Sequence, residues 1–415
     1  MRDQKLIQIG QESAEVSKRY LMKSLELFTG AGGLALGISF AGFKHLALIE
    51  HDHDACVSLR ENQHRGVLDM SRWPVSHCSV EHFDYGIIPE GLELLAAGVP
   101  CQPFSIGGKH RGHEDERNMF PLTVDIIRKI KPKAVLIENV RGLTRSSFAK
   151  YFNYIQLMLT YPEVRRKSTE DWVDHLGRLE RYHMKGKPDG LSYRVVVRVL
   201  NAADYGVPQK RERVFIVGFR SDLGLEWSFP QRTHSSDALL WEQFCSGEYW
   251  AKHKLSKRLI PKPSQSGQVR VEKLKNGLLP LQRPWRTVRD AISDLPRPSK
   301  VREQEEPGLN HFFIPGARSY VGHTGSPLDE PAKTLKAGDH GVPGGENMLL
   351  EPNGTVRYFT IRESARLQTF PDEYVFPGSW TESMRQIGNA VPVDLAAYLA
   401  KNIRASLESK TSKAA

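Results

Sequence analysis

A cysteine between two prolines is the residue of this chain with the clearest potential for nucleophilic chemistry. Cys101 lies in GVPCQPFS, residues 98–105, directly after an apolar run at residues 92–97. If that run is a strand of an open α/β sheet, the thiol lies at its carboxyl end, where such sheets bind ligands. A buried, inert cysteine is the alternative, and it is the commoner state of a lone cysteine.

Acidic and cationic side chains accompany two other strand-like segments. Glu138 follows an apolar run at residues 134–137, and its carboxylate would face the thiol if the two strands were neighbours. On a strand, Gln209, Arg211 and Arg213 would project to one face, because side chains alternate with period two. These side chains suit a polar, planar ligand, but a solvated edge strand explains the pattern equally well.

A glycine-rich turn, LFTGAGG at residues 27–33, opens an expected helix. Glycine lets the backbone approach a ligand, and a helix N-terminus offers free N–H groups. The spacing matches neither a dinucleotide fingerprint nor a phosphate loop, so a structural turn and a nucleoside pocket are equally compatible with it. Glu50 ends the next apolar run, where a carboxylate could bind ribose hydroxyls; a helix cap or a solvent contact is the alternative.

Alternating strands and helices would position these groups. Helical patterns, as at residues 119–130 and 148–159, alternate with short apolar runs at residues 25–28, 46–50, 92–97 and 134–137. This alternation predicts an α/β fold, a doubly wound Rossmann-like sheet with helices on both faces. The β-branched residues at 193–200 and 213–219 predict an antiparallel pair of strands, and the charged segment at 165–167 predicts a surface insertion.

The character of the chain changes after residue 220. Residues 221–350 are rich in Pro, Gly and Lys without a sustained helical period, which predicts a second, smaller, irregular and mostly β domain. Residues 393–407 return to a helical period. The predicted organisation is a polar extension at 1–20, a catalytic domain at 21–220, a second domain at 221–360, a return to the first domain at 361–408 and a disordered tail at 409–415.

The net positive charge of the chain comes from one stretch. The 415 residues carry 58 Lys+Arg against 48 Asp+Glu, a net charge of +10. Residues 252–289 hold eleven basic side chains against one acid, which leaves 47 of each sign elsewhere. Such a run is either a solvated loop or a surface that contacts phosphates, because released counterions drive cations onto nucleic acid.

Composition excludes several classes of protein. No apolar run approaches the ~18 residues of a membrane span, and the start of the chain lacks the apolar segment of a signal peptide. The four cysteines have no CxxC spacing, which argues against both a disulfide framework and structural zinc. We therefore expect a cytoplasmic protein that uses no metal and has no membrane partner.

Taken in chain order, the motifs resemble those of the DNA (cytosine-5)-methyltransferases. F-x-G-x-G-G at 28–33, P-C-Q-x-F-S at 100–105, E-N-V at 138–140 and Q-x-R-x-R at 209–213 occur in the order of that family, and residues 362–371 and 386–392 resemble its last two motifs. The resemblance implies a bacterial, nucleoid-associated modification enzyme. It would transfer a methyl group from S-adenosylmethionine to C5 of a flipped-out cytosine in double-stranded DNA, with residues 221–360 as the target-recognition domain.

The resemblance also implies a role for each motif residue. Cys101 would attack C6 of cytosine, Glu138 would hydrogen-bond or protonate N3, and Arg213, supported by Arg211, would bind O2. The residues expected to hold the cosubstrate are Phe28, Gly30, Gly32, Gly33, Glu50, Ser79, Val80, Pro100, Asn389 and Val391. The residues expected to contact DNA are Ser105, Lys109, Arg111, Gln209, Lys252, Lys254, Lys257, Arg258, Thr334 and Leu335.

One position departs from the pattern of the family. An Asp followed by a hydrophobic residue usually holds the adenine edge, and the best match here is Ser79-Val80. A serine hydroxyl can still accept a hydrogen bond, so we expect weaker anchoring; Asp84 is the alternative. The glycine-rich, basic residues 106–112 could close over a substrate.

Two other functions compete with this interpretation. An RNA (tRNA) cytosine-5 methyltransferase would share the fold, although the long basic region before Thr334 is unlike that branch. A catalytically silent DNA-binding protein would keep the fold without the chemistry. We expect a monomer that works with a restriction endonuclease; the sequence alone determines neither the DNA sequence recognised nor the side chain that replaces the flipped cytosine.

Overall fold

The computed structural model describes residues 21–100, 119–186, 189–298, 310–321, 324–337 and 347–414. Four residues with an expected role, Cys101, Ser105, Lys109 and Arg111, lie outside these ranges, as does the glycine-rich stretch at 106–112. Among the described helices, none combines the length and the apolar character that crossing a membrane requires.

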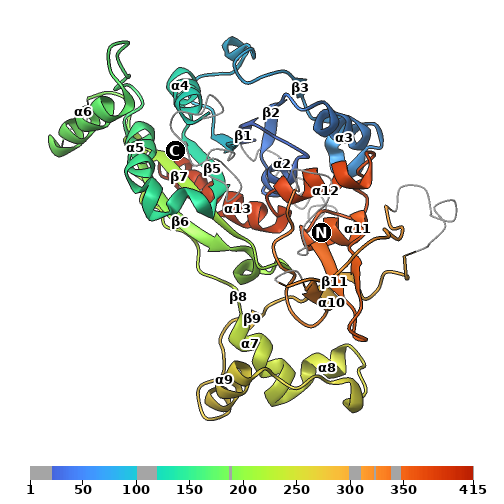
Figure 1. The fold of residues 1–415 in the computed structure, drawn as a ribbon. Helices are drawn as coiled ribbons and strands as arrows, with labels where there is room; N and C mark the ends of the chain where they lie inside the picture. The colour runs from blue at the N-terminus through green and yellow to red at the C-terminus, as the bar shows by residue number, and fades with distance from the viewer. Residues whose placement is uncertain are drawn as a thin grey trace, which may run out of the picture.

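A seven-stranded mixed sheet lies at the centre of the fold (Figure 1). Its order is β3-β2-β1-β4-β5-β7-β6; β7 runs antiparallel to β5 and β6, and the other neighbouring pairs are parallel. The strands are β1 (Lys23–Leu27), β2 (Lys44–Glu50), β3 (Val75–His77), β4 (Leu94–Gly98), β5 (Ala134–Val140), β6 (Tyr193–Asn201) and β7 (Glu212–Arg220). The doubly wound sheet and its antiparallel edge pair are both confirmed.

Helices cover both faces of this sheet because its central strands are apolar on both sides. In β4, Leu95 packs into the core shared with α4, α5 and α6, whereas Leu94 packs into the core shared with α2 and α13. Figure 1 shows α5 and α13 on opposite sides of β5 and β7. The helices are α2 (Gly33–Phe40), α3 (His53–His64), α4 (Phe120–Ile130), α5 (Ala149–Thr160), α6 (Trp172–Met184) and α13 (Val393–Ala414).

The insertion predicted around residues 165–167 is the loop between α5 and α6. His175 of α6 hydrogen-bonds through Nε2 to the carbonyl of Val164 at 2.6 Å and through Nδ1 to the hydroxyl of Tyr154 in α5 at 2.9 Å. These buried contacts hold the two helices together. The side chains of residues 165–167 are exposed, as expected for a surface insertion.

Helix α13 packs directly on α2. A Cβ built on Gly37 of α2 would lie 2.4 Å from the Cβ of Ala396 and 2.6 Å from the backbone nitrogen of Ala397, so only glycine fits between the helices. Helix α13 then continues through Ala414, and the disordered tail predicted from residue 409 is wrong. Extending a helix that already exists needs no new nucleation, so weak local propensity suffices.

Residues 221–298 contain far more helix than strand, so the prediction of a mostly β domain is wrong there. Residues 234–285, which we call the arm, contain short helices, a π-helical turn and two paired strands, β8 (His234–Ser235) and β9 (Arg283–Pro284). The helices of the arm are α7 (Ser236–Trp241), α8 (Glu248–Lys252) and α9 (Gln265–Lys275). Such short helices hardly repeat the helical period, which explains why the sequence pattern did not reveal them.

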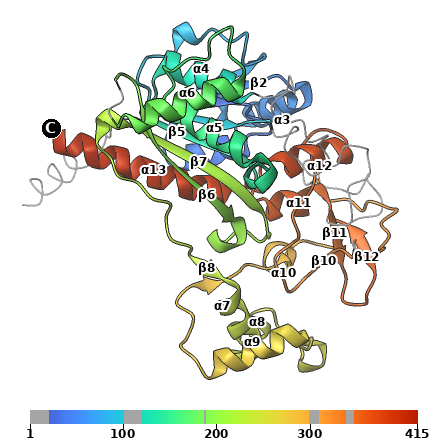
Figure 2. The same cartoon turned by 60° about the vertical axis from the view of Figure 1, so that its left-hand side comes forward.

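The arm has a small core of its own and projects from the rest of the molecule (Figure 2). Leu239, Tyr249 and Trp250 form this core. The elements after the arm instead share a core with α2 and α3. Packing therefore gives no boundary at residue 360, the predicted end of the second domain. These elements are α10 (Val288–Ile292), the small sheet of β10 (Ser326–Pro327), β11 (Met348–Leu350) and β12 (Val356–Tyr358), and helices α11 (Ile361–Leu367) and α12 (Trp380–Asn389).

The close packing of α2 on α13 predicts opposite effects for two glycine-to-alanine changes. Gly37→Ala should lower the free energy of unfolding by ~1–3 kcal/mol, because the new methyl group overlaps α13. Gly177→Ala is the matched control in α6, where the nearest atom to the new Cβ is Arg181 Nη1 at 3.6 Å. It should raise stability by up to ~1 kcal/mol through helix propensity. Urea denaturation measures both; equal effects would contradict the packing argument.

Candidate active site

The carboxyl ends of four neighbouring strands bring the predicted site residues to one edge of the sheet. Strands β4 and β5 pair in parallel with Gly98 opposite Glu138, which confirms that the two strands are neighbours. Asn139 donates from Nδ2 to the carbonyl of Val99 at 3.0 Å. This bond ties β5 to the segment that leads through Pro100 toward Cys101.

Glu50 has a carboxylate that backbone N–H groups hold in place at the end of β2. Oε2 accepts from the N–H of Gly30 at 2.7 Å, and Oε1 accepts from those of His51 and Asp52 at 2.8 and 2.7 Å. The side chain is buried, although it lies beside the exposed ring of His51. Three donors from two segments lock the glycine-rich turn to the carboxylate, which suits a group that must bind ribose in a fixed position.

The glycine-rich turn has an unusual backbone conformation. Phe28, Gly30 and Gly32 have φ angles of 57°, 55° and 78°, the left-handed region that only glycine enters freely. The strain at Phe28 is held by the bond from the N–H of Thr29 to the carbonyl of Ile49 at 3.1 Å. The turn therefore leaves β1 in a fixed direction beside β2.

Residues from near the end of the chain close the other side of this turn. A Cβ built on Gly33 would lie 2.4 Å from the carbonyl oxygen of Val391 and 3.2 Å from the Cβ of Ala390, so any larger residue would push the two segments apart. Tyr374 also donates its hydroxyl to the carbonyl of Ala31 at 2.7 Å. Asn389, at the end of α12, is exposed beside this contact.

Ser79 and Asp84, the two candidates for the adenine edge, lie in different surroundings. The N–H of Cys78 donates to the carbonyl of Glu50 at 3.0 Å, which places Ser79 next to the end of β2. The neighbouring Val80 is buried. Asp84 is exposed, and its carboxylate caps a short 3-10 turn by accepting from the N–H of Gly86 at 2.8 Å.

Glu138 and Arg213 form a nearly buried ion pair at the carboxyl end of β5. Nε of Arg213 lies 3.0 Å from Oε1 of Glu138, and both side chains are at least 86% shielded from solvent. Burial raises the pKa of Glu138, and the charges of Arg213 and Arg211 only partly offset this. A carboxyl group whose pKa is raised keeps its proton more easily and can donate it to a ligand.

Arg211 lies deeper than expected for a residue that assists catalysis. Its side chain is fully buried and donates to the carbonyls of Leu335 at 3.0 Å, Gly388 at 2.6 Å and Ala390 at 3.0 Å. The guanidinium therefore joins the start of β7 to two segments from the C-terminal half of the chain. Its charge still reaches Glu138, so a supporting role stays compatible with this position.

Two residues expected to contact DNA lie inside the protein. Gln209 is fully buried; its amide donates to Gln368 Oε1 at 3.2 Å, and its carbonyl oxygen accepts from the N–H of Leu335 at 3.0 Å. Leu335 is itself fully buried, whereas Thr334 is partly exposed and donates its hydroxyl to the carbonyl of Lys210 at 2.7 Å. These contacts fasten residues 331–337 to the start of β7, so the structure offers neither Gln209 nor Leu335 to DNA.

The structure divides the eleven basic side chains of residues 252–289 into two groups. Five lie within ion-pair distance of an acid: Lys252 (Asp290), Arg270 (Asp237), Lys275 (Glu272), Arg286 (Asp394) and Arg289 (Asp329). Six are exposed and have no ion pair with any described acid: Lys254, Lys257, Arg258, Lys262, Lys273 and Arg283. The second group is the cationic surface available for phosphates.

Sequence reasoning missed several polar residues that hold the site together. Gln368 donates from Nε2 to the carbonyls of Ile387 at 2.7 Å and Ala390 at 3.1 Å, and Asn139 fixes the segment before Cys101. Gln386 accepts from the hydroxyl of Ser58 at 2.8 Å. All three lie within motifs already noted, so their place in a motif was the signal available from the sequence. Only the structure shows that their side chains are used inside the protein.

The fold is a doubly wound α/β fold, and this sheet edge brings a glycine-rich turn and a buried carboxylate together with an acid–arginine pair. Comparisons with known proteins identify the family. Its sequence profile, described as C-5 cytosine-specific DNA methylase, matches residues 22–161 and 175–405. The chain therefore belongs to the C-5 cytosine-specific DNA methylase family, and its enzyme class is DNA cytosine-5 methyltransferase.

Individual relatives agree with this assignment. The chain is 32% identical over 396 residues to the Type II methyltransferase M.PspPI of Psychrobacter sp. (strain TA137), covering 94% of this chain and 80% of that protein. It is 33% identical over 383 residues to the Type II methyltransferase M.Eco47II of Escherichia coli, covering 91% and 78%. The crystal structure of S. pombe Dnmt2 methyltransferase shares the fold, with a TM-score of 0.53 at 16% identity over 94% of this chain and 99% of that one.

The ion pair at Glu138 predicts how stability depends on pH. A carboxyl group whose pKa is raised by folding binds its proton more tightly in the folded state, so the free energy of unfolding falls as pH rises through that pKa. Arg213→Met should raise this pKa further and enlarge the fall by ~1.4 kcal/mol per added pKa unit. Arg213→Lys keeps a charge and should stay closer to the wild type. Urea denaturation between pH 5 and pH 9 measures this; coincident curves for wild type and Arg213→Met would refute the assignment.

Proposed function

We propose that this DNA cytosine-5 methyltransferase moves the methyl group of S-adenosylmethionine to C5 of a flipped-out cytosine within a specific duplex sequence. The reaction proceeds through a bond between Sγ of Cys101 and C6 of the base. The observation that carries the proposal is the register of β4 against β5, because it places the Glu138–Arg213 pair beside the strand whose continuation is Cys101.

The residues of the sheet edge fit the cosubstrate. A carboxylate fixed by three N–H groups at Glu50 suits ribose hydroxyls, and the turn at 28–33 offers a backbone without side chains at three positions. Ser79 and Val80 follow Cys78, which is hydrogen-bonded to Glu50, and would hold the adenine; Asn389 and Val391, whose segment contacts Gly33, would bind from the other side. S-adenosylmethionine supplies the electrophilic methyl group when it is bound there.

The catalytic side chains must activate a carbon that is a poor nucleophile. The thiolate of Cys101 adds to C6, and the electron pair displaced toward C5 then takes the methyl group, so that the bond between the methyl carbon and the sulfonium sulfur breaks and S-adenosylhomocysteine leaves. Loss of the C5 proton and elimination of the thiolate restore the aromatic ring. Glu138 holds a proton at N3, and Arg213 stabilises the charge that develops at O2. The raised pKa of Glu138 favours this protonated state.

The DNA-binding part of the proposal rests on the exposed cations of the arm. The target base lies inside the duplex, so it must be flipped out at a cost of ~a few kcal/mol. Lys254, Lys257 and Arg258 would bind backbone phosphates and so help to offset that cost. The relatives named as Type II methyltransferases support a role in the bacterial cytoplasm as the modification partner of a restriction endonuclease.

Replacing the proposed nucleophile separates catalysis from binding. Cys101→Ser should reduce methyl transfer to duplex DNA below detection, because a serine hydroxyl is not ionised at neutral pH, while DNA binding survives. Cys245→Ser is the matched control, since that thiol lies in the arm and should leave activity unchanged. A tritiated-methyl assay with duplex DNA and transfer RNA in competition gives the readout. Label in RNA alone, or full activity of Cys101→Ser, would overturn the proposal.

The exposed cations predict the salt dependence of DNA binding. Replacing Lys254, Lys257 and Arg258 together by Gln should flatten the plot of log affinity against log salt by ~0.9 for each phosphate that the protein no longer neutralises. The control replaces Arg165, Arg166 and Lys167 by Gln, which removes the same charge from the exposed loop between α5 and α6. Fluorescence anisotropy at several salt concentrations measures both slopes. Equal flattening in the two variants would contradict a specific role for the arm.

A further inference from the structure

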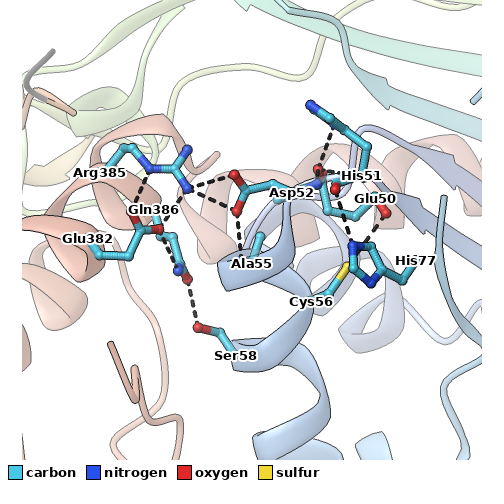
Figure 3. Close-up of polar contacts among 11 residues, drawn as sticks. Glu50, His51, Asp52, Ala55, Cys56, Ser58, His77, Glu382, Arg385 and Gln386 are labelled. Carbon is cyan, nitrogen blue, oxygen red and sulfur yellow. Dashed lines mark hydrogen bonds and ion pairs between the residues drawn. The ribbon is translucent and has the colours of Figure 1, made fainter. Parts of the chain in front are cut away.

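A network of charged groups joins the two segments proposed to hold the cosubstrate (Figure 3). We call them the Glu50 wall, at the end of β2, and the 389–391 wall, at the end of α12. Arg385 of α12 donates from Nη2 to both carboxylate oxygens of Asp52, each at 2.9 Å. It also donates from Nε and Nη2 to the oxygens of Glu382 at 2.8 and 2.7 Å. A single guanidinium thus bridges an acid of its own helix and an acid 333 residues away in the chain.

Asp52 also contacts Glu50, the residue proposed to bind ribose. Its own N–H donates to Oε1 of Glu50 at 2.7 Å, and its side chain caps α3 by accepting from the N–H of Ala55 at 2.8 Å. Burial alone would raise the pKa of Asp52, but the Ala55 N–H and Arg385 outweigh burial, so the pKa lies below its ordinary value. Asp52 is therefore charged at neutral pH and fixed at both ends.

Helix α12 connects Arg385 to the 389–391 wall. Gln386, the residue after Arg385, donates to Glu382 Oε1 at 2.9 Å and accepts from Ser58 of α3 at 2.8 Å. The helix ends at Asn389, and Val391 follows against Gly33 of the glycine-rich turn. A shift of Arg385 relative to Asp52 would therefore change the distance between Glu50 and the segment at 389–391.

The fold does not need this ion pair for its stability. The side chains of Arg385 and Asp52 are 35% and 30% exposed, and ion pairs with that exposure contribute little to folding. The end of α12 is anchored separately by Arg211 and Gln368, which bind the carbonyls of Gly388 and Ile387. Removing the pair should leave both walls folded and in contact, with α12 held less firmly against the start of α3 because, among the described residues, only the Ser58–Gln386 bond still joins the two helices there.

We propose that Arg385 is a positioning residue that sets the affinity for S-adenosylmethionine by holding the Glu50 wall against the 389–391 wall through Asp52. The inference rests on the proposed function, since it takes the space between these walls as the cosubstrate site. The arm and its cations lie elsewhere, so the effect is specific to the cosubstrate and does not extend to DNA.

Two single changes and their combination test the inference. Asp52→Asn removes the charge but keeps a residue that caps helices well, and Arg385→Met keeps the length of the side chain without its donors. Each should weaken binding of S-adenosylmethionine and S-adenosylhomocysteine roughly 5- to 10-fold, as for a modest coupling between sites. The double variant should be no weaker than either single variant, because both remove the same contact.

Isothermal titration calorimetry with either ligand measures the affinity directly, without turnover. KM for S-adenosylmethionine should rise, while KM for DNA, kcat and the melting temperature of the free protein stay near wild type. Arg65→Met is the matched control, because it removes an exposed Arg–Glu pair at the end of α3 and should change none of these values.

The possible outcomes separate the inference from the proposed function. Unchanged ligand affinity in both single variants, additive effects in the double variant, or an equal rise of KM for DNA would each overturn the role of Arg385. A wild-type protein that binds neither S-adenosylmethionine nor S-adenosylhomocysteine would overturn the proposed function, and the inference with it.

Discussion

A buried arginine is the constraint on which the rest of the site depends. Arg211 is fully removed from water, and a guanidinium in that position must find acceptors. It finds the carbonyls of Leu335, Gly388 and Ala390, which come from two segments more than a hundred residues further along the chain. Their positions relative to β7 are thereby fixed, and with them the surroundings of the neighbouring Glu138–Arg213 pair.

The proposed cosubstrate pocket follows from a second meeting of distant segments. The wall that carries Glu50 belongs to β2, and the wall that carries Asn389 and Val391 belongs to the end of α12. Gly33 lets these walls touch, since any side chain there would overlap the carbonyl of Val391. Helices α2 and α13, which are far apart in the chain, pack on the same face of the sheet, so the core contacts between them also hold the segment after α12 beside the glycine-rich turn.

Charge has different uses in different parts of the molecule. Near the sheet edge, arginines are paired with acids or carbonyls and hold the architecture in place. In the basic stretch at residues 252–289, six of the eleven basic side chains are exposed and have no ion pair with a described acid, while the other five lie near acids of this chain. A net charge counted along the sequence therefore overstates the number of cations available to a polyanion.

The sequence by itself determined six of the seven strands of the sheet, the strand ends that carry Glu50 and Glu138, and the family, but not the three-residue edge strand β3. Apolar runs buried on both faces and motifs of reactive residues are local patterns, so a linear reading detects them. Only the tertiary structure decided that Gln209 and Leu335 face inward, that the arm is helical, and that Arg385 meets Asp52. These features depend on contacts between segments far apart in the chain, or on helices too short to repeat their period, and no local pattern encodes either.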